Sequence, residues 1–454
     1  MQEFIDPALI KKYNTNAPRY TSYPTALSFS EDFYRDDIIH AVQTSGKRDL
    51  SLYIHIPFCH SLCYYCGCNK IVTRHQDKAD IYLDYLEKEI EQQARLFRHY
   101  KVRQVHLGGG TPSFLSPLQM NRLMSMLRKH FCVMLDAEFG IEIDPRRISL
   151  DYLDHLRHVG FNRISIGVQD TDTKVQQAIN RVQSTEFVAS LVERAKQLGF
   201  SSVNLDLIYG LPWQNRQTFA TTLDQVLTMM PERLSLFSYA HLPSRFAAQR
   251  KIRDEWLPDA ETKSQLMFQA IDTLTRAGYE FIGMDHFAQP TDELAKAQKA
   301  GNLHRNFQGY TTLGECDLLG LGVSSISAIG NTFSQNHKEL KDYYVSLDEK
   351  DHALAKGVLL TNDDIIRAGI IKDIMCNSRV NIAEVERDFG IRFNEYFADA
   401  LGRLVPFIRD GLVSVNDKYI RISDKARLLV RNIAMAFDAY AHHEDQRQRF
   451  SKVM

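Results

Sequence analysis

Short apolar runs alternate with longer amphipathic stretches between about residues 50 and 240. The short runs are rich in valine, isoleucine and leucine, as strands of a buried sheet are. The longer stretches repeat apolar residues at intervals of three and four, which is the period of an amphipathic helix. Such alternation predicts an α/β fold with a parallel sheet. The apolar runs are residues 50–56, 103–109, 138–144, 162–168, 202–210 and 233–240, and the helical stretches include 76–98, 116–131 and 183–199.

Three regions of the chain differ in pattern. Residues 1–48 are polar and predict an extended arm that covers the site. Residues 49–350 hold the strand–helix alternation, followed by a segment expected to close over it. Residues 351–454 are mainly helical, with a hairpin-like stretch at 413–422 that is similar to a winged helix. We therefore expect an arm, a central domain and a helical lid domain.

Composition and charge exclude several classes of protein. The 454 residues are 44% hydrophobic and 24% charged, as in a folded chain of two or three domains. The net charge is −1, and the C-terminal helices and hairpin are of mixed sign, so we expect no nucleic-acid partner. No run of eighteen apolar residues and no signal-peptide core occur, which predicts a cytoplasmic protein without a membrane span.

Four of the seven cysteines lie in one short loop directly after the first apolar run. Cys59, Cys63 and Cys66 have the spacing C-x-x-x-C-x-x-C, and Cys68 follows. Thiolates are the usual ligands of iron–sulfur clusters, and three ligands on a four-iron cluster leave one iron open to a small molecule. A structural zinc site would normally use a second cysteine pair, and a disulfide framework does not suit an intracellular chain with an odd cysteine count. We therefore predict an open [4Fe–4S] cluster.

The three remaining cysteines carry no such pattern. Cys316 is isolated, and an incidental or structural thiol is the better interpretation. Cys132 and Cys376 stand in apolar helical surroundings, which predicts that both are buried in the core.

Polar or glycine-rich residues follow the later apolar runs. In a parallel sheet these positions meet at one edge, where loops carry binding residues. The glycines at 108–110 allow a close approach of backbone to a ligand, although a tight turn would also use them. Glu142 suits the paired hydroxyls of a ribose, whereas Asp144 before Pro145 also fits a helix cap. Any one position has a structural explanation, but their repetition favours a ligand site: Thr111, Glu142, Gln169, Arg181, Asp206 and Ala240.

Three short sequence motifs indicate a resemblance to a known family. They are YIHIPFC at 53–59, GCNKIVTR at 67–74 and RYTSYP at 19–24. With the cysteine spacing, they resemble the radical S-adenosylmethionine (SAM) enzymes and, among these, the oxygen-independent coproporphyrinogen III oxidase family. The resemblance implies a partial, open (β/α)6 TIM-like barrel, with the site at the C-terminal ends of its strands.

The resemblance also implies roles for individual residues and two bound SAM molecules. Tyr53, His55 and Cys68 are the candidate catalytic residues. Cys68 is not expected as a fourth cluster ligand, because that would exclude SAM. Position 65 often holds phenylalanine in the family, and Tyr65 keeps the aromatic face. Implied contacts to the SAM on the cluster are Tyr53, Gly109, Glu142 and Ile326, and implied contacts to the second are Tyr65, Gly110, Thr111, Gln169, Arg181, Asp206 and Ala240.

The implied reaction converts two propionate side chains of coproporphyrinogen III to vinyl groups, giving protoporphyrinogen IX without oxygen. A radical made by reductive cleavage of SAM removes a β-hydrogen, and carbon dioxide and one electron are then lost. This needs a low-potential electron donor such as a flavodoxin or ferredoxin, and we expect a monomer. The alternative is a haem-binding chaperone on the same fold, but Cys68 and the words at 19–24 and 67–74 favour the oxidase.

The substrate carries four carboxylates and therefore requires basic residues at the mouth of the site. Arg19, Lys70 and Arg305 are the candidates. The arm either supplies Arg19, Tyr20 or Tyr23 to the substrate or is a strap over the core, and the resemblance favours the first interpretation.

Overall fold

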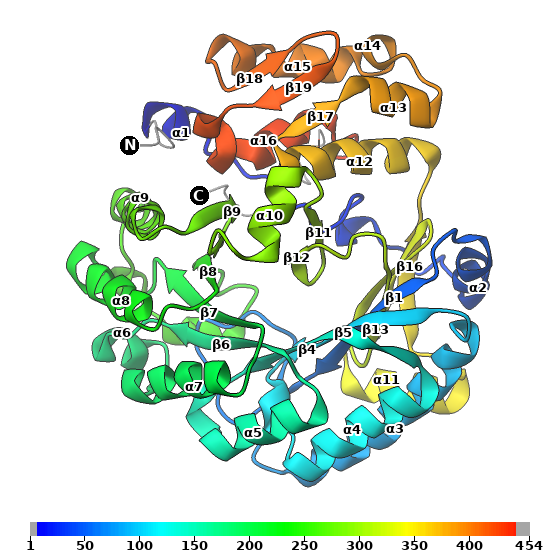
Figure 1. Ribbon diagram of the computed structural model, residues 1–454, viewed down its shortest axis with the longest axis vertical. Coiled ribbons are helices and arrows are strands. Elements are labelled where there is room, and N and C mark those ends of the chain that lie inside the picture. The colour runs from blue at the N-terminus through cyan, green and yellow to red at the C-terminus, as the bar shows by residue number, and fades with distance from the viewer. Residues whose placement is uncertain (1–6, 442–454) are drawn as a thin grey trace.

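The computed structural model describes residues 7–441 and is built on one twelve-stranded sheet (Figure 1). Six parallel strands form its centre and are neighbours in chain order, as the sequence predicts for a (β/α)6 barrel that stays open. These strands are β1 (Asp49–Ile56), β4 (Lys101–Gly109), β5 (Cys132–Ile143), β6 (Arg163–Gln169), β7 (Ser202–Tyr209) and β8 (Arg233–Ser238).

Helices between the strands cover the outer face of the barrel (Figure 1). Their starts follow local chemistry: Ser116, Ser184 and Asn215 each accept a hydrogen bond from an amide in the first turn that follows. The helices are α3 (Asp77–Leu96), α4 (Pro117–His130), α5 (Leu150–Val159), α6 (Thr173–Ala178), α7 (Thr185–Gln197), α8 (Arg216–Thr228) and α9 (Ala260–Arg276).

Alternation along β1 separates the core from the interior of the barrel. The even-numbered residues from Leu50 to Ile56 are fully buried in the main hydrophobic core. The odd-numbered residues Ser51, Tyr53 and His55 point to the other side, because successive side chains of a strand alternate. The register places Tyr53 beside His106 of β4, so the polar faces of neighbouring strands meet inside the barrel.

Additional strands extend both edges of the parallel sheet instead of closing the barrel. Beside β1 lies β13 (Asp317–Leu321), which is parallel to it, and beyond it three antiparallel strands follow. Beside β8 lies the antiparallel β10, and β9 is at that edge. The outer strands are β14 (Ile326–Ile329), β15 (Thr332–Asn336), β16 (Leu354–Leu359), β9 (Glu280–Gly283) and β10 (His286–Ala288).

The edge strands β9 and β10 are separated by a turn. One expectation for this region needs correction. Of the segment expected to close over the barrel, only the hairpin of β11 (His304–Asn306) and β12 (Gly309–Thr311) contributes to the central cavity. The glycine-rich residues 314–322 that follow the hairpin contain β13, whose backbone pairs with β1.

A second hydrophobic core joins the arm to the C-terminal domain. Tyr20 and Tyr23 of the arm are buried in it, together with residues of the long helix α12 (Asn362–Asn377). The predicted hairpin at 413–422 is present as β18 and β19. The other elements of these regions are α1 (Pro7–Tyr13), α2 (Arg35–Thr44), α10 (Glu293–Ala300), α11 (Leu340–Glu349), β17 (Arg379–Asn381), α13 (Ile382–Phe389), α14 (Phe393–Tyr396), α15 (Ala398–Arg409), β18 (Val413–Val415), β19 (Tyr419–Ile422) and α16 (Val430–Ala434).

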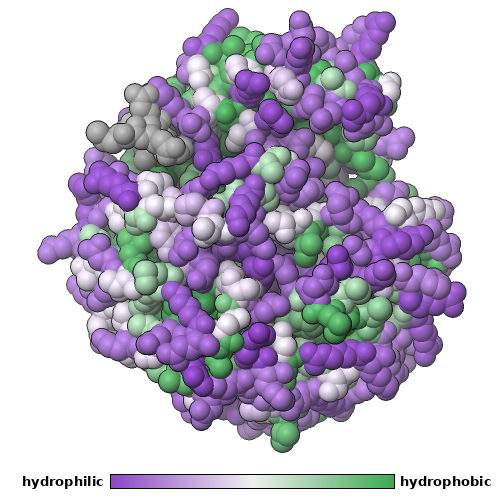
Figure 2. All heavy atoms as spheres, viewed as in Figure 1, coloured by the Kyte–Doolittle hydropathy of each residue, from purple (hydrophilic) through white to green (hydrophobic). Residues whose placement is uncertain are grey.

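The surface of the protein is mainly hydrophilic. Hydrophilic side chains cover most of the face seen in Figure 2, and apolar ones form small separate patches. Among residues 7–441, no helix is both long enough and apolar enough to cross a bilayer.

Cys376 is buried as predicted, but the prediction for Cys132 is wrong: it begins β5 and is exposed. A strand end at the rim of the sheet has no layer above it to cover the thiol.

Candidate active site

The cysteine loop begins where β1 ends and is closed by two short parallel strands. These are β2 (Phe58–Cys59) and β3 (Ile71–Val72), and the amide of Thr73 donates to the carbonyl of Cys59 over 2.9 Å. The loop between them is therefore fixed at both ends. Its three predicted ligands are carried by one rigid turn and need no distant segment.

Two arginines surround Cys63, which is buried. Its sulfur accepts hydrogen bonds from Arg146 Nη2 over 3.3 Å and from Arg181 Nη1 over 3.5 Å. Asp144 forms ion pairs with both arginines, at 2.6 Å and 3.6 Å. Burial alone would raise the pKa of Asp144, but Arg181 and Arg146 outweigh burial and lower it to about 2.

The other three loop cysteines differ in acidity. A hydrogen bond from Cys68, with the nearby Lys70, lowers the pKa of Cys66 to about 6 although burial opposes it. The same bond to Cys66 raises the pKa of the Cys68 thiol, which stays a protonated donor. Burial, followed by Cys66 and Cys63, raises the pKa of Cys59 to about 12. A metal bound here must displace the proton of Cys59 but finds Cys66 already ionised.

This donor set fits a cluster better than a single ion. Four tetrahedral ligands of one zinc ion at about 2.3 Å have donor atoms roughly 4 Å apart. Within residues 7–441, the only three-donor group with all atoms within 4.8 Å of one another is Glu87, Glu91 and His130, where Arg122 already pairs with Glu87. The cysteine sulfurs are spread more widely, as ligands on different irons are.

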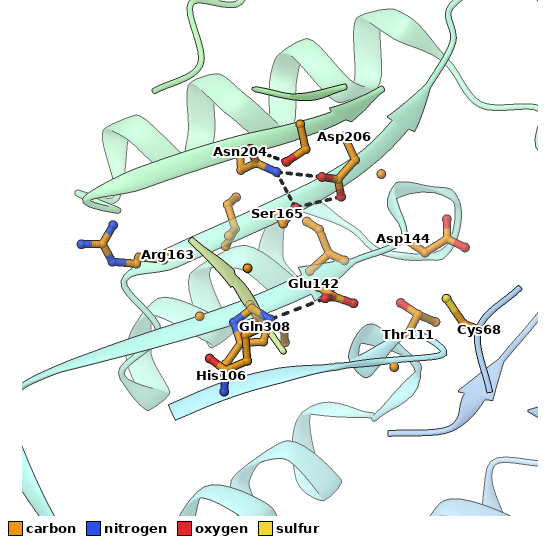
Figure 3. A pocket seen from close by; sticks show the side chains of 18 of the residues that line it. Cys68, His106, Thr111, Glu142, Asp144, Arg163, Ser165, Asn204, Asp206 and Gln308 are labelled. Atoms are coloured by element: carbon orange, nitrogen blue, oxygen red, sulfur yellow. Dashed lines mark hydrogen bonds and ion pairs between the residues drawn. The ribbon is translucent and has the colours of Figure 1, made fainter. Parts of the chain in front are cut away.

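A polar cavity of about 460 Å³ runs from the cysteine loop into the barrel (Figure 3). Barrels of this type normally fill their interior with branched apolar side chains. Here the inward positions hold hydrogen-bonding groups instead: Asp206 accepts from Ser165 over 2.9 Å and from Asn204 over 2.8 Å. Such an interior is shaped to hold a polar ligand.

The four residues predicted to contact the first SAM come from neighbouring strands. Gly109 and Glu142 line the cavity, and Glu142 Oε1 lies 3.5 Å from His106 Nε2. The Tyr53 ring stacks on His106 with centroids 6.1 Å apart. Ile326 does not line the cavity and lies on β14, where its carbonyl faces Gly320, the residue opposite Tyr53 in the sheet. Two of the four therefore line the cavity, Tyr53 contacts the lining residue His106, and Ile326 does not line it.

At position 109 both the backbone conformation and the available space favour glycine. Its φ is +118°, in the region that favours glycine, and a Cβ there would lie 2.6 Å from the His55 ring. The residue therefore allows β4 to pass close to His55.

Six of the seven residues predicted for the second SAM line the same cavity, and only Ala240 does not. Ala240 lies just outside, and its carbonyl accepts from Gln249 Nε2 over 3.2 Å. Arg181 is fully enclosed and donates to the Gly167 carbonyl over 2.7 Å. Burial, with the charge of Glu142, raises the pKa of Asp206 to about 6. The lining residues of this set are Tyr65, Gly110, Thr111, Gln169, Arg181 and Asp206.

Comparison with known proteins gives a consistent result. Residues 53–226 match the family described as the Radical SAM superfamily, and residues 360–429 match the HemN C-terminal domain. The chain is 56% identical to the oxygen-independent coproporphyrinogen III oxidase of Salmonella typhimurium over 99% of this chain and 98% of the relative. It is 55% identical to the Escherichia coli protein of the same name, with the same coverage.

The chain belongs to the oxygen-independent coproporphyrinogen III oxidase family. A solved structure of coproporphyrinogen III oxidase (HemN) from Escherichia coli, described as a radical SAM enzyme, is also similar to it. The TM-score is 0.94 at 54% identity, with 97% of this chain and 100% of that chain covered. Fold class and family predicted from the sequence are therefore confirmed, and the haem-binding chaperone is not favoured.

The surroundings of His55 keep its imidazole ring neutral. Its Nε2 lies 3.1 Å from the Asn69 carbonyl, so Nε2 carries the proton and donates. Nδ1 then accepts from the Tyr53 hydroxyl over 3.2 Å. Burial lowers the pKa of His55, which keeps the ring uncharged at neutral pH. The pair Tyr53–His55 is thus a fixed neutral contact between β1 and the cysteine loop.

Tyr20 and Tyr23 of the N-terminal arm point away from the cavity. The Tyr20 hydroxyl donates to Asp438 over 2.9 Å, and the Tyr23 hydroxyl accepts from the Ala439 amide over 3.0 Å. Both rings are buried in the second core, so they tie the arm to the C-terminal domain. Arg19 instead lies 3.5 Å from Asp285 and is partly exposed. Of Arg19, Tyr20 and Tyr23, only Arg19 is exposed.

Several site residues escaped the sequence analysis. Arg146 follows the predicted strand end at Asp144, and a basic pair after an acidic strand end could have signalled it. His106 and Gln104 occupy alternate positions of β4 and could have been found from that alternation. Gln308 lines the cavity from the β11–β12 hairpin, and no local pattern marks it.

Proposed function

We propose that this protein oxidatively decarboxylates two propionate side chains of coproporphyrinogen III to vinyl groups, giving protoporphyrinogen IX. The single observation that supports this best is three ionisable cysteines of one loop at the end of a polar cavity, in a chain that matches oxidases of this name over 99% of its length.

The proposed cofactors are a [4Fe–4S] cluster on Cys59, Cys63 and Cys66 and two SAM molecules in the cavity. When bound, this pair supplies one-electron chemistry that ends with removal of a hydrogen atom from the substrate. Arg146 and Arg181 offset the negative charge of the thiolates from behind Cys63. Cys68 donates to Cys66 and is not proposed as a ligand.

The residues around the cavity are proposed to bind and orient. Glu142, held near His106, would accept hydrogen bonds from ribose hydroxyls of the first SAM. Asp206 and Gln169 would do the same for the second SAM, with Ser165 and Asn204 fixing the carboxylate. Tyr53 and the neutral His55 hold the loop against β1.

Basic residues at the rim are proposed to receive the substrate carboxylates. Lys70 lines the cavity and donates to the Cys66 carbonyl over 3.0 Å. Arg19 and Arg305 lie together, since Arg305 donates to the Arg19 carbonyl. We further propose a monomer, in the cytoplasm, that is reduced by a low-potential carrier such as a flavodoxin or ferredoxin.

An anaerobic assay tests this function. The purified protein is reconstituted with iron and sulfide and incubated with SAM, a reductant and coproporphyrinogen III. We expect two vinyl groups and two carbon dioxide molecules per substrate, with SAM consumed. Cys132→Ser, which changes an exposed thiol far from the loop in sequence, is the matched control for Cys66→Ser. A protein that binds haem but cleaves no SAM would refute the proposal.

A further inference from the structure

Residues 242–256 form a separate layer on the outside of the cysteine loop. The segment follows β8 and contains the short 3-10 helix Ala247–Lys251. Gln249 is buried, and its Nε2 donates to the Tyr65 carbonyl over 3.0 Å. The Phe246 ring packs so closely on Gly67 that a Cβ there would lie 3.0 Å from it. The segment is therefore attached directly to the backbone that carries the cluster ligands.

The exposed side of this layer is basic. Arg245, Arg250 and Lys251 are exposed, and none of them forms an ion pair among residues 7–441. The segment holds four cations against two acids: Arg253 is paired with Glu255 at 3.7 Å, and Asp254 lies 3.0 Å from His241. The net charge of the whole chain is −1, which makes this concentration of unpaired cations local.

Two exposed apolar side chains belong to the same surface. Leu242 and Trp213 are exposed by 41% and 38%. Trp213 is joined to the end of the layer, because its amide donates to the Trp256 carbonyl over 2.8 Å. Apolar residues beside a rim of cations are typical of protein–protein interfaces.

We propose that this surface, defined as residues 242–253 with Trp213, is the docking site of an acidic one-electron carrier protein. The inference depends on the proposed function, because it requires a reducible cluster in the loop. The carrier gives up one electron and the bound cluster gains it, and no bond is made or broken. Opposite charge steers the carrier to the segment that contacts the loop backbone at Tyr65 and Gly67.

Charge reversal tests the docking surface. The double variant Arg245→Glu, Lys251→Glu alters two exposed residues that hold no cofactor contact. The matched control is Lys418→Glu, Arg421→Glu, which makes the same charge change on the exposed C-terminal hairpin. Cluster reduction is followed by stopped-flow absorbance with reduced flavodoxin as the probe, at low and high salt, and separately with dithionite.

We expect reduction by flavodoxin to be about tenfold slower in the first variant at low salt, with a weaker salt dependence. The control variant should match the wild type, and dithionite should reduce all three proteins equally. Equal flavodoxin rates in all three, or a dithionite rate that also falls in the first variant, would overturn the docking site. A wild type that takes up no iron would refute the proposed function itself, and docking with it.

Discussion

The Tyr82 hydroxyl donates a 2.6 Å hydrogen bond to the backbone carbonyl of His55, and both are buried. The same hydroxyl accepts from the Val323 amide over 3.1 Å. A helix on the outside of the barrel thereby fixes the strand end that leads into the cysteine loop, and also the turn after β13. Glu89, about two turns further along α3, supports this turn by accepting from the Gly322 amide over 2.7 Å.

Removing the Tyr82 hydroxyl should destabilise the protein and loosen the loop. Tyr82→Phe leaves a buried carbonyl and a buried amide without this partner, which costs about 1–3 kcal/mol of unfolding free energy. Urea unfolding of the metal-free protein measures the loss, and iron content after gel filtration reports the loop. Tyr344→Phe is the control, since no hydrogen bond of that half-buried hydroxyl occurs within residues 7–441. Equal stability of the two variants would contradict the role of Tyr82.

A substitution at Gly322 separates backbone strain from steric overlap. Gly322 has φ +93°, and a Cβ would overlap the Tyr82 hydroxyl and lie 2.8 Å from the His55 carbonyl. Gly199 has φ +73° with nothing within 4 Å of the same atom. We expect Gly199→Ala to cost about 1–2 kcal/mol from left-handed strain alone, and Gly322→Ala clearly more. Chemical denaturation compares them, and similar losses would mean that β1 yields to the added methyl.

Serine substitution should distinguish ligands from the supporting cysteine. Cys59→Ser, Cys63→Ser or Cys66→Ser should abolish the visible cluster absorbance and most bound iron, because each removes one of three proposed thiolates. Cys68→Ser should keep iron, since it replaces a donor to Cys66 by another donor. Cys132→Ser should behave as wild type. Loss of iron in Cys68→Ser equal to that of the other three would make Cys68 a ligand.

Asp206 should make the protein less stable as the pH rises through weakly acidic values. Its pKa is about 6 when folded, because it is buried, against 3.8 in a free chain. The folded state therefore holds a proton that the unfolded state releases, and stability falls between about pH 4 and pH 6. Two pKa units correspond to at most about 3 kcal/mol. Asp206→Asn cannot titrate, so its stability relative to wild type should rise across this window.

The melting temperatures of metal-free wild type and Asp206→Asn at successive pH values measure this effect. Asp170 has its pKa raised to about 6 as well, but it is present in both proteins and cancels in the difference. A difference that does not change with pH would show that Asp206 stays ionised in the cavity.

Periodicity predicted all six parallel strands because each is an apolar run with a helix after it. Five agree to within two residues at each end, and β5 begins six residues earlier than predicted. The extension of the sheet by β13–β16 was not predicted, since short strands with small and polar residues, such as Thr332–Asn336, have little pattern of their own. Cys132 was misplaced because apolar neighbours do not show that a residue is at the rim of a sheet. The arm was expected either to supply Arg19, Tyr20 or Tyr23 to the substrate or to cover the core, with the resemblance favouring the first. The burial of Tyr20 and Tyr23 against the C-terminal domain depends on contacts about 400 residues away along the chain.

The sequence predicted the site residues best where they lie at the ends of adjacent strands. Gly110, Gln169 and Asp206 line one cavity because parallel strands in chain order bring their ends together. Gln308 was missed because its hairpin reaches the cavity through tertiary packing, not through a repeat in the sequence.

The attachment of Tyr20 to Asp438 has a consequence for synthesis of the chain. The arm leaves the ribosome well before Asp438, since 418 positions separate Tyr20 from it. The barrel strands and the cysteine loop emerge between the two. During translation the loop can therefore meet cellular iron donors before the arm is fastened over the finished enzyme.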